Sequence, residues 1–183
     1  MRLKRFVATL SLILCFSLLF TTSAITYELN VLPILKLKSN WCWVATAQMV
    51  AKYKYPNISK SQESCVIHIK GSAVNEGGNE MEHRAAILYF SNDNMAYVRG
   101  TFGLNRNLIQ TSISKGYPMT LGVVSPNHVY VIKGINTASV PENDQLILIN
   151  PDDASICYTF YSNLLKGTWS GGTYNDHFYS NMI

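Results

Sequence analysis

The sequence has little net charge and no close pairs of metal-binding residues. Three of its 15 Lys and Arg residues lie within the first five positions, and all 11 Asp and Glu residues lie beyond residue 24, so residues 25–183 carry a net charge near +1. A chain without a basic excess is not typical of proteins that bind nucleic acid or an anionic membrane. No two cysteines and no two histidines stand at the spacings of structural zinc sites. We predict no metal and no other cofactor.

The sequence also lacks an apolar run long enough for a comfortable membrane span. Its longest run, from Phe6 to Phe20, follows three basic residues and leads to the small residue Ala24. This order is typical of a secretory signal peptide that is cleaved after a small residue, whereas a membrane-spanning helix needs about 20 apolar residues. We therefore expect residues 1–24 to be a signal peptide, the protein to be secreted, and no stable membrane anchor.

The 159 residues that would remain after cleavage suit a single domain, which we expect to be monomeric. They contain three cysteines, Cys42, Cys65 and Cys157, so at least one thiol is free or pairs outside the chain. Export permits disulfides without requiring them. A Cys65–Cys157 bridge and three unpaired thiols are both compatible with the sequence.

Helical patterns dominate the first half of the mature chain and strand patterns the second. Helices followed by strands predict an α+β fold with a mainly helical lobe over 25–117 and a mainly β lobe, an antiparallel sheet or small barrel, over 118–183. Glycine-rich stretches at 71–79 and 167–176 are typical of loops. Helices are predicted over 41–53, with Ser39 or Asn40 as its cap, and over 59–67, 80–89 and 104–114, and strands over 119–124, 128–135, 145–150 and 156–161.

Cys42 stands at the start of the first predicted helix, where free backbone N–H groups favour a thiolate. A cysteine in an apolar helix is usually just a small buried residue, but this position favours a nucleophile. His128 opens an apolar strand and Asn150 ends a later one. If these strands form an antiparallel hairpin, the two side chains meet, as the base of a cysteine nucleophile and its orienting group must.

One further side chain is a candidate for the site, and three histidines are not. Trp43 directly follows Cys42, and we expect it to line the substrate cleft. The other histidines, His68, His83 and His177, stand in polar or mixed surroundings that are typical of surface histidines. These three are therefore not predicted to take part in the chemistry.

The segment SNWCWVATAQMVAKY, residues 39–53, resembles the nucleophile helix of the compact bacterial papain-like cysteine proteases, such as bacteriocin-leader peptidase domains and secreted effector proteases of plant pathogens. The later segments NHVYVIKGI and LILINPDD resemble that family's histidine strand and its Asn/Asp-Pro strand, in the same order. The resemblance implies a papain-like fold and hydrolysis of peptide or protein substrates. Cys42 would be the nucleophile, His128 the general acid/base and Asn150 the orienting residue, with Asp152 as the alternative for the last role.

One position departs from the family pattern. Papain-like enzymes place a glutamine about six residues before the nucleophile as an oxyanion-hole donor, and this sequence has Lys36 there. Lysine also donates hydrogen bonds, so Lys36 is the oxyanion-hole candidate, with Lys38 or Asn40 as substitutes. Because losing one such donor costs roughly two to three orders of magnitude in rate, a catalytically weak or dead homologue that binds peptides or a partner is one alternative. A transglutaminase-like acyltransferase, which would use the same thiol, is another.

Overall fold

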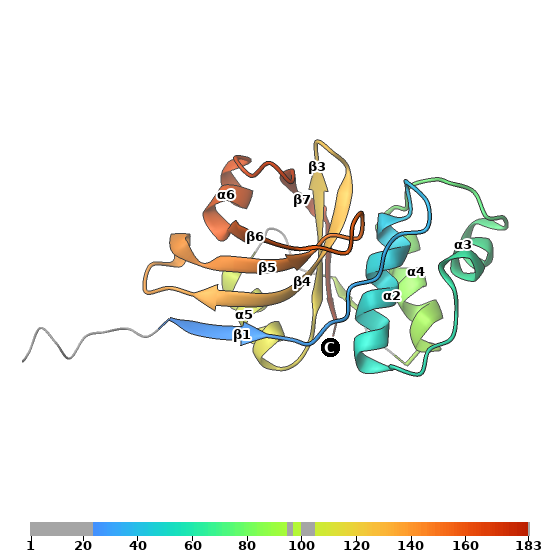
Figure 1. The fold of residues 1–183 in the computed structure, drawn as a ribbon, viewed down its shortest axis with the longest axis horizontal. Helices are drawn as coiled ribbons and strands as arrows, with labels where there is room; N and C mark the ends of the chain where they lie inside the picture. The colour runs from blue at the N-terminus through green and yellow to red at the C-terminus, as the bar shows by residue number, and fades with distance from the viewer. Residues whose placement is uncertain (1–23, 95–96, 100–104, 183) are drawn as a thin grey trace, which may run out of the picture.

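The computed structural model describes residues 24–94, 97–99 and 105–182. Helices α2, α3 and α4 lie together on one side of the molecule, and an antiparallel seven-stranded sheet occupies the other (Figure 1). The predicted fold class, helices followed by an antiparallel sheet, is confirmed, although one short strand, Ile25–Glu28, precedes the helices. Among the described residues, no helix is both long and apolar enough to cross a membrane.

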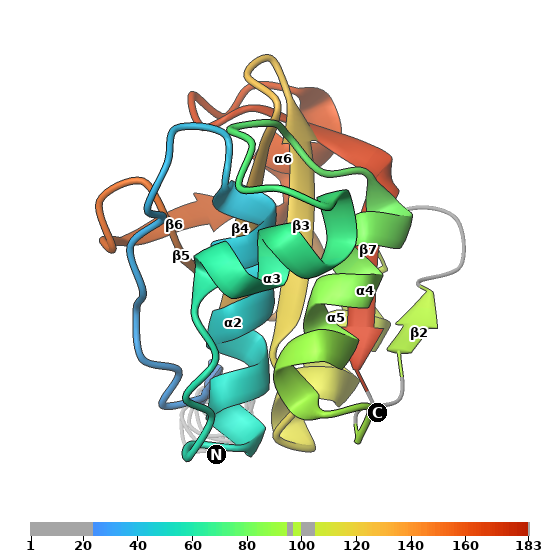
Figure 2. The same cartoon turned by 90° about the vertical axis from the view of Figure 1, so that its right-hand side faces the viewer.

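The helical lobe is built around α2 (Cys42–Lys54), which packs against α3 (Gln62–Lys70), α4 (Glu80–Ser91) and the sheet. Figure 2 shows α2 and α4 in front of the strands. Every residue of α2 from Trp43 to Ala51 is buried, as expected of a helix that is covered on all sides. The helix begins after Trp41 without a side-chain cap, so the predicted cap at Ser39 or Asn40 is wrong.

The sheet has the strand order β2-β7-β3-β4-β5-β6, and β1 also pairs with β4. The loop predicted over 167–176 is wrong from Thr173 onward, because that part of the chain pairs with β3. Pairing with an ordered neighbour overrides the low strand propensity of this Gly-rich stretch. The strands are β1 (Ile25–Glu28), β2 (Tyr97–Arg99), β3 (Met119–Val124), β4 (His128–Thr137), β5 (Gln145–Ile149), β6 (Ile156–Phe160) and β7 (Thr173–Met182).

The central strand β4 is buried on both faces, which explains its continuous apolar sequence. Val129 and Val131 face the core shared with α2, whereas Tyr130 and Ile132 face a second core on the opposite side of the sheet. The helix α5 (Arg106–Ser114), although it belongs to the mainly helical half of the sequence, contributes to that second core, as does α6 (Tyr161–Lys166). A short 3₁₀ helix, Pro141–Asn143, lies between β4 and β5. Because β4 packs against α2, the first residue of β4 lies at the junction of the two lobes.

Candidate active site

Cys42 is the first residue of α2, and its half-buried side chain reaches toward β4. Burial raises the pKa of the thiol, while hydrogen bonds from the backbone N–H groups of Val129 and Trp43 and the positive charge of Lys36 lower it. Because Val129 follows His128 directly, its contact places the sulfur beside the strand that carries the predicted base. The nucleophile candidate therefore meets the β lobe at the start of β4.

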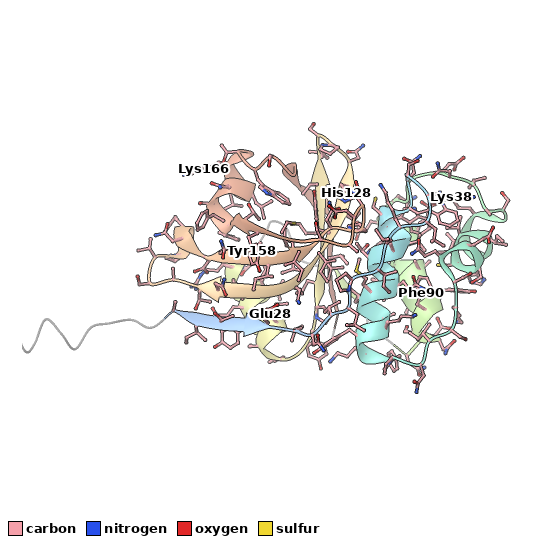
Figure 3. The ribbon with its side chains drawn as sticks, viewed as in Figure 1. Glu28, Lys38, Phe90, His128, Tyr158 and Lys166 are labelled. Carbon is pink, nitrogen blue, oxygen red and sulfur yellow. The ribbon has the colours of Figure 1, made fainter. Side chains whose placement is uncertain are left out.

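His128 is the first residue of β4, and its imidazole Nε2 lies 2.9 Å from Asn150 Oδ1. The predicted hairpin is confirmed: β4 and β5 are antiparallel, with Val131 opposite Ile149, so that His128 and Asn150 lie at the same end. Burial lowers the pKa of His128, and the hydrogen bond with Asn150 opposes this shift. Figure 3 labels His128 at the end of the sheet that faces the helices.

Cys42 and His128 line one cavity of about 480 Å³ between the two lobes. Trp43 also lines this cavity, but its side chain is fully buried and its indole Nε1 donates to Glu76 O over 3.2 Å; its role in a substrate cleft stays a prediction. Trp43 thus forms a fixed wall of the cavity. The remaining lining residues are Gly77, Gly78, Asn79, Glu80, Gly122, Val123, Asn127 and Val129.

Residues 20–162 match the model of a protein family described as papain-like cysteine protease AvrRpt2. The chain belongs to this family. Among solved structures, the crystal structure of UfSP from C. elegans is similar over 91% of this chain, with a TM-score of 0.55 and 12% sequence identity. This chain spans 36% of the length of that structure. No curated protein matches the sequence. The predicted family and the α+β papain-like fold class are confirmed.

Lys36 stands where the family pattern has a glutamine, and its ammonium group has two partners. Its Nζ lies 2.6 Å from Asp152 Oδ1 and donates to Ser39 O, also over 2.6 Å. Asp152, the alternative orienting residue, has its Oδ1 3.5 Å from His128 Nε2, farther than the 2.9 Å of Asn150 Oδ1. Asn150 is therefore the closer partner of the imidazole, and the oxyanion role of Lys36 stays a prediction.

The glycine-rich loop over 71–79 is bonded to the segment just before and at the start of α2. Its backbone carbonyls accept hydrogen bonds from side chains of that segment, including Lys38 and Asn40, the two substitutes considered for the oxyanion donor. Sequence alone predicted a surface loop, since the pairing of this loop with residues more than thirty positions earlier has no local signal. The bonds join Lys38 Nζ to Ala73 O (2.7 Å), Asn40 Nδ2 to Asn75 O (2.9 Å) and Trp41 Nε1 to Val74 O (2.9 Å).

His83 is buried within the helical lobe, so its predicted surface position is wrong. Its Nε2 lies 3.3 Å from Thr46 Oγ1, and the same hydroxyl donates to Cys42 O over 2.9 Å. Burial lowers the pKa of His83 to about 3, so the ring is neutral at pH 7. The buried set His83, Ala86, Ile87 and Phe90 follows the spacing of one helix face, which is the signal that identifies this position as internal.

All three described cysteines are free thiols, so the alternative with a Cys65–Cys157 bridge is wrong. Burial raises the pKa of Cys65 to about 12 and that of Cys157 to about 11. Both therefore remain protonated near neutral pH. Within the described part of the chain, no three His, Cys, Asp or Glu side chains are grouped so that they could hold a metal ion.

Proposed function

We propose that this protein is a cysteine peptidase that hydrolyses peptide bonds, with Cys42 as nucleophile, His128 as general acid/base and Asn150 as orienting residue. The observation that carries the proposal is the arrangement around His128. The imidazole and the Cys42 thiol line one cavity, and Asn150 Oδ1 lies 2.9 Å from the imidazole Nε2. Family membership supports the same reaction class and peptide or protein substrates.

The contact with Asn150 defines the tautomer that the mechanism needs. A carbonyl oxygen accepts, so Nε2 carries the hydrogen toward Asn150 Oδ1, and Nδ1 is left to accept a proton from the thiol. Asn150 Oδ1 also accepts the backbone N–H of Asp152 over 3.1 Å, which orients the amide. The third residue thereby sets both the ring orientation and the nitrogen that faces the nucleophile.

The reaction then takes two acyl-transfer steps. His128 Nδ1 takes the proton of Cys42, the thiolate sulfur attacks the peptide carbonyl carbon, and the imidazolium returns the proton to the leaving amine. Water, deprotonated by the same nitrogen, next attacks the thioester carbonyl and releases the carboxylate and the free thiol. We expect free backbone N–H groups at the start of α2 to stabilise the negative charge that develops on the substrate oxygen.

Substitution of Cys42 tests the proposal directly. We expect Cys42→Ala to lower peptide hydrolysis by at least about 10³-fold, because no other group replaces the nucleophile. Cys157→Ala is the matched control, since it removes a half-buried thiol on β6 outside the cavity and should leave the rate unchanged. A Cys42→Ala protein that cleaves peptides as fast as the parent contradicts the proposal.

A catalytically weak or dead peptide-binding homologue is the second candidate, favoured by the engagement of the Lys36 ammonium with Asp152 and Ser39 O. Alkylation with an iodoacetamide or E-64-type probe near pH 6 separates the two. A peptidase should label at Cys42 far faster than a free thiol, whereas a dead homologue should not. Incorporation of a primary amine into the acyl product would instead identify a transglutaminase-like acyltransferase.

We also propose that the protein is exported and loses residues 1–24 as a signal peptide. In support, Ile25 directly follows the proposed cleavage site and is the first residue of β1, where its backbone N and O contact Thr137 Oγ1 at 3.3 and 3.0 Å. Cleavage there would preserve every described strand. The N-terminal sequence of the exported protein should begin at Ile25. Exported protein that still begins at Met1 contradicts the proposal.

A further inference from the structure

The backbone around Lys36 is held by both lobes. On the helical side, the buried Gln62 side chain accepts the N–H of Leu37 over 3.0 Å and donates to Leu35 O over 2.8 Å. On the β side, the N–H of Lys36 itself donates to Pro151 O over 2.8 Å. These three bonds fix the Lys36 backbone without using its ammonium group. Removing the charge should therefore leave the chain path intact.

The ammonium group meets a carboxylate that also faces the imidazole. One oxygen, Asp152 Oδ1, lies 2.6 Å from Lys36 Nζ and 3.5 Å from His128 Nε2. The Lys36 side chain is 17% exposed and that of Asp152 47% exposed. A partly buried charge is screened less by salt than one at the surface, so both charges act on the neighbouring titratable groups.

We propose that Lys36 and Asp152 form an ion pair across the junction of the lobes that sets the protonation of Cys42 and His128, an inference that rests on the proposed catalytic pair. Lys36 is then a positioning residue that acts through charge. Its ammonium offsets the Asp152 carboxylate, which alone would favour the imidazolium form of His128. The uncharged glutamine of the family cannot compensate the negative charge of Asp152. In this chain, the effect of Lys36 therefore depends on Asp152.

The charges of Lys36 and Asp152 act in opposite directions on the pKa values of Cys42 and His128. Burial is the largest influence, raising the pKa of Cys42 and lowering that of His128; beyond it, Lys36 lowers both pKa values and Asp152 raises both. Removing the Lys36 charge must therefore shift the pKa values of Cys42 and His128 in one direction, and removing the Asp152 charge must shift them in the other. A loss of packing would not produce shifts of opposite sign. The other groups that face the imidazole or line the cavity are Asp153, Tyr130 and Glu80, and they stay in place in every variant below.

The test is the pH dependence of Cys42 alkylation by iodoacetamide, with the labelled cysteine identified by mass mapping. We expect Lys36→Met to shift the midpoint upward by about one pH unit and Asp152→Asn to shift it downward by about half a unit. The double variant should return close to the parent. Cys65 and Cys157, with pKa values of about 12 and 11, stay protonated and react slowly below pH 9.

Two control variants separate charge from other effects. Lys38→Met removes the same charge from the same segment, but Lys38 Nζ bonds to Ala73 O, so its midpoint should match the parent. Lys36→Arg keeps the charge and should restore the parent midpoint. The inference is overturned if Lys36→Met matches Lys38→Met, or if Lys36→Met and Asp152→Asn shift the midpoint in the same direction.

His128→Ala distinguishes failure of this inference from failure of the proposed function. Without the imidazole, Cys42 should titrate as an ordinary buried thiol, with its midpoint displaced to alkaline pH. An unchanged profile in His128→Ala contradicts the catalytic pair itself. A changed profile there, together with unchanged profiles in Lys36→Met and Asp152→Asn, contradicts only the role of the ion pair.

Discussion

The two lobes hold their catalytic candidates by different means. In the helical lobe, Cys42 begins a helix without a side-chain cap, and indole and other side-chain groups bond that segment to the glycine-rich loop. In the β lobe, His128 and Asn150 are aligned by the backbone register of β4 and β5. The nucleophile's position thus depends on particular side chains, whereas the base's position depends on strand pairing. Apart from Cys42 itself, side-chain substitutions should therefore affect folding mainly in the first lobe and chemistry mainly in the second.

Within the β lobe, the largest effect on activity is expected from His128→Ala. Because strand pairing holds this position, the variant should fold, yet peptide hydrolysis should fall by about 10³-fold from loss of the acid/base, equivalent to ~4 kcal/mol of transition-state stabilisation. The rate of hydrolysis is measured with a peptide substrate, and the free energy of unfolding is measured by urea titration. His68→Ala, at an exposed histidine on α3, should leave the rate unchanged. A large loss of stability in His128→Ala would break the comparison.

Trp43→Ala should be the most destabilising of the variants considered in the helical lobe. The side chain is fully buried between α2 and the glycine-rich loop, so its removal should lower the free energy of unfolding by about 3–5 kcal/mol. Tyr158→Ala is the β-lobe counterpart: this aromatic on β6 is 54% exposed, and its loss should cost below about 1 kcal/mol. Urea titrations of both variants should differ accordingly. Equal losses would contradict the burial of the Trp43 side chain.

Gly78→Ala should disturb the same loop by a smaller amount. A Cβ at Gly78 would lie 2.4 Å from Trp43 Cδ2, whereas one at Gly77 would meet nothing within 4 Å. Since Trp43 is buried and cannot move freely, we expect Gly78→Ala to cost about 1–3 kcal/mol and to slow peptide hydrolysis. Gly77→Ala is the matched control and should match the parent in a thermal melt. Similar melting temperatures for both variants would contradict the close approach of loop and indole.

The smallest effect concerns the pH dependence of stability in the helical lobe. The pKa of His83 has its ordinary value of 6.5 in the unfolded chain, and burial lowers it to about 3 in the folded protein, so the unfolded state binds more protons between these two pH values. Stability is therefore lost as the pH falls below 6.5, by about 1 kcal/mol between pH 6.5 and 5.5. His83→Gln should remove this slope, whatever it does to absolute stability. Urea midpoints at the two pH values measure the difference, and an unchanged slope in the variant contradicts the burial of a neutral ring.

The parts of the fold that the sequence predicted best are those with strong local patterns. The helix at Cys42–Lys54 and the strands β3 to β6 match their predicted ranges within about two residues, because apolar periodicity and turn residues define them. β1, β2 and β7 were not predicted. β1 and β2 are short, and β7 follows a Gly-rich stretch and lacks an apolar run. Their partners lie far away in the sequence, so only pairing makes them strands.

The sequence by itself determined that Cys42 begins a helix and that His128 and Asn150 share one end of a hairpin, since both features follow from local patterning and short connections. Tertiary structure decided what surrounds them. It brought Asp152 to Lys36, buried His83 against Thr46 and kept Cys65 and Cys157 apart as free thiols. The first two contacts join residues that are distant in the chain, and side-chain packing within and between the lobes selects them. The candidate nucleophile was thus visible in the sequence, but the charges that we propose to act on it were not.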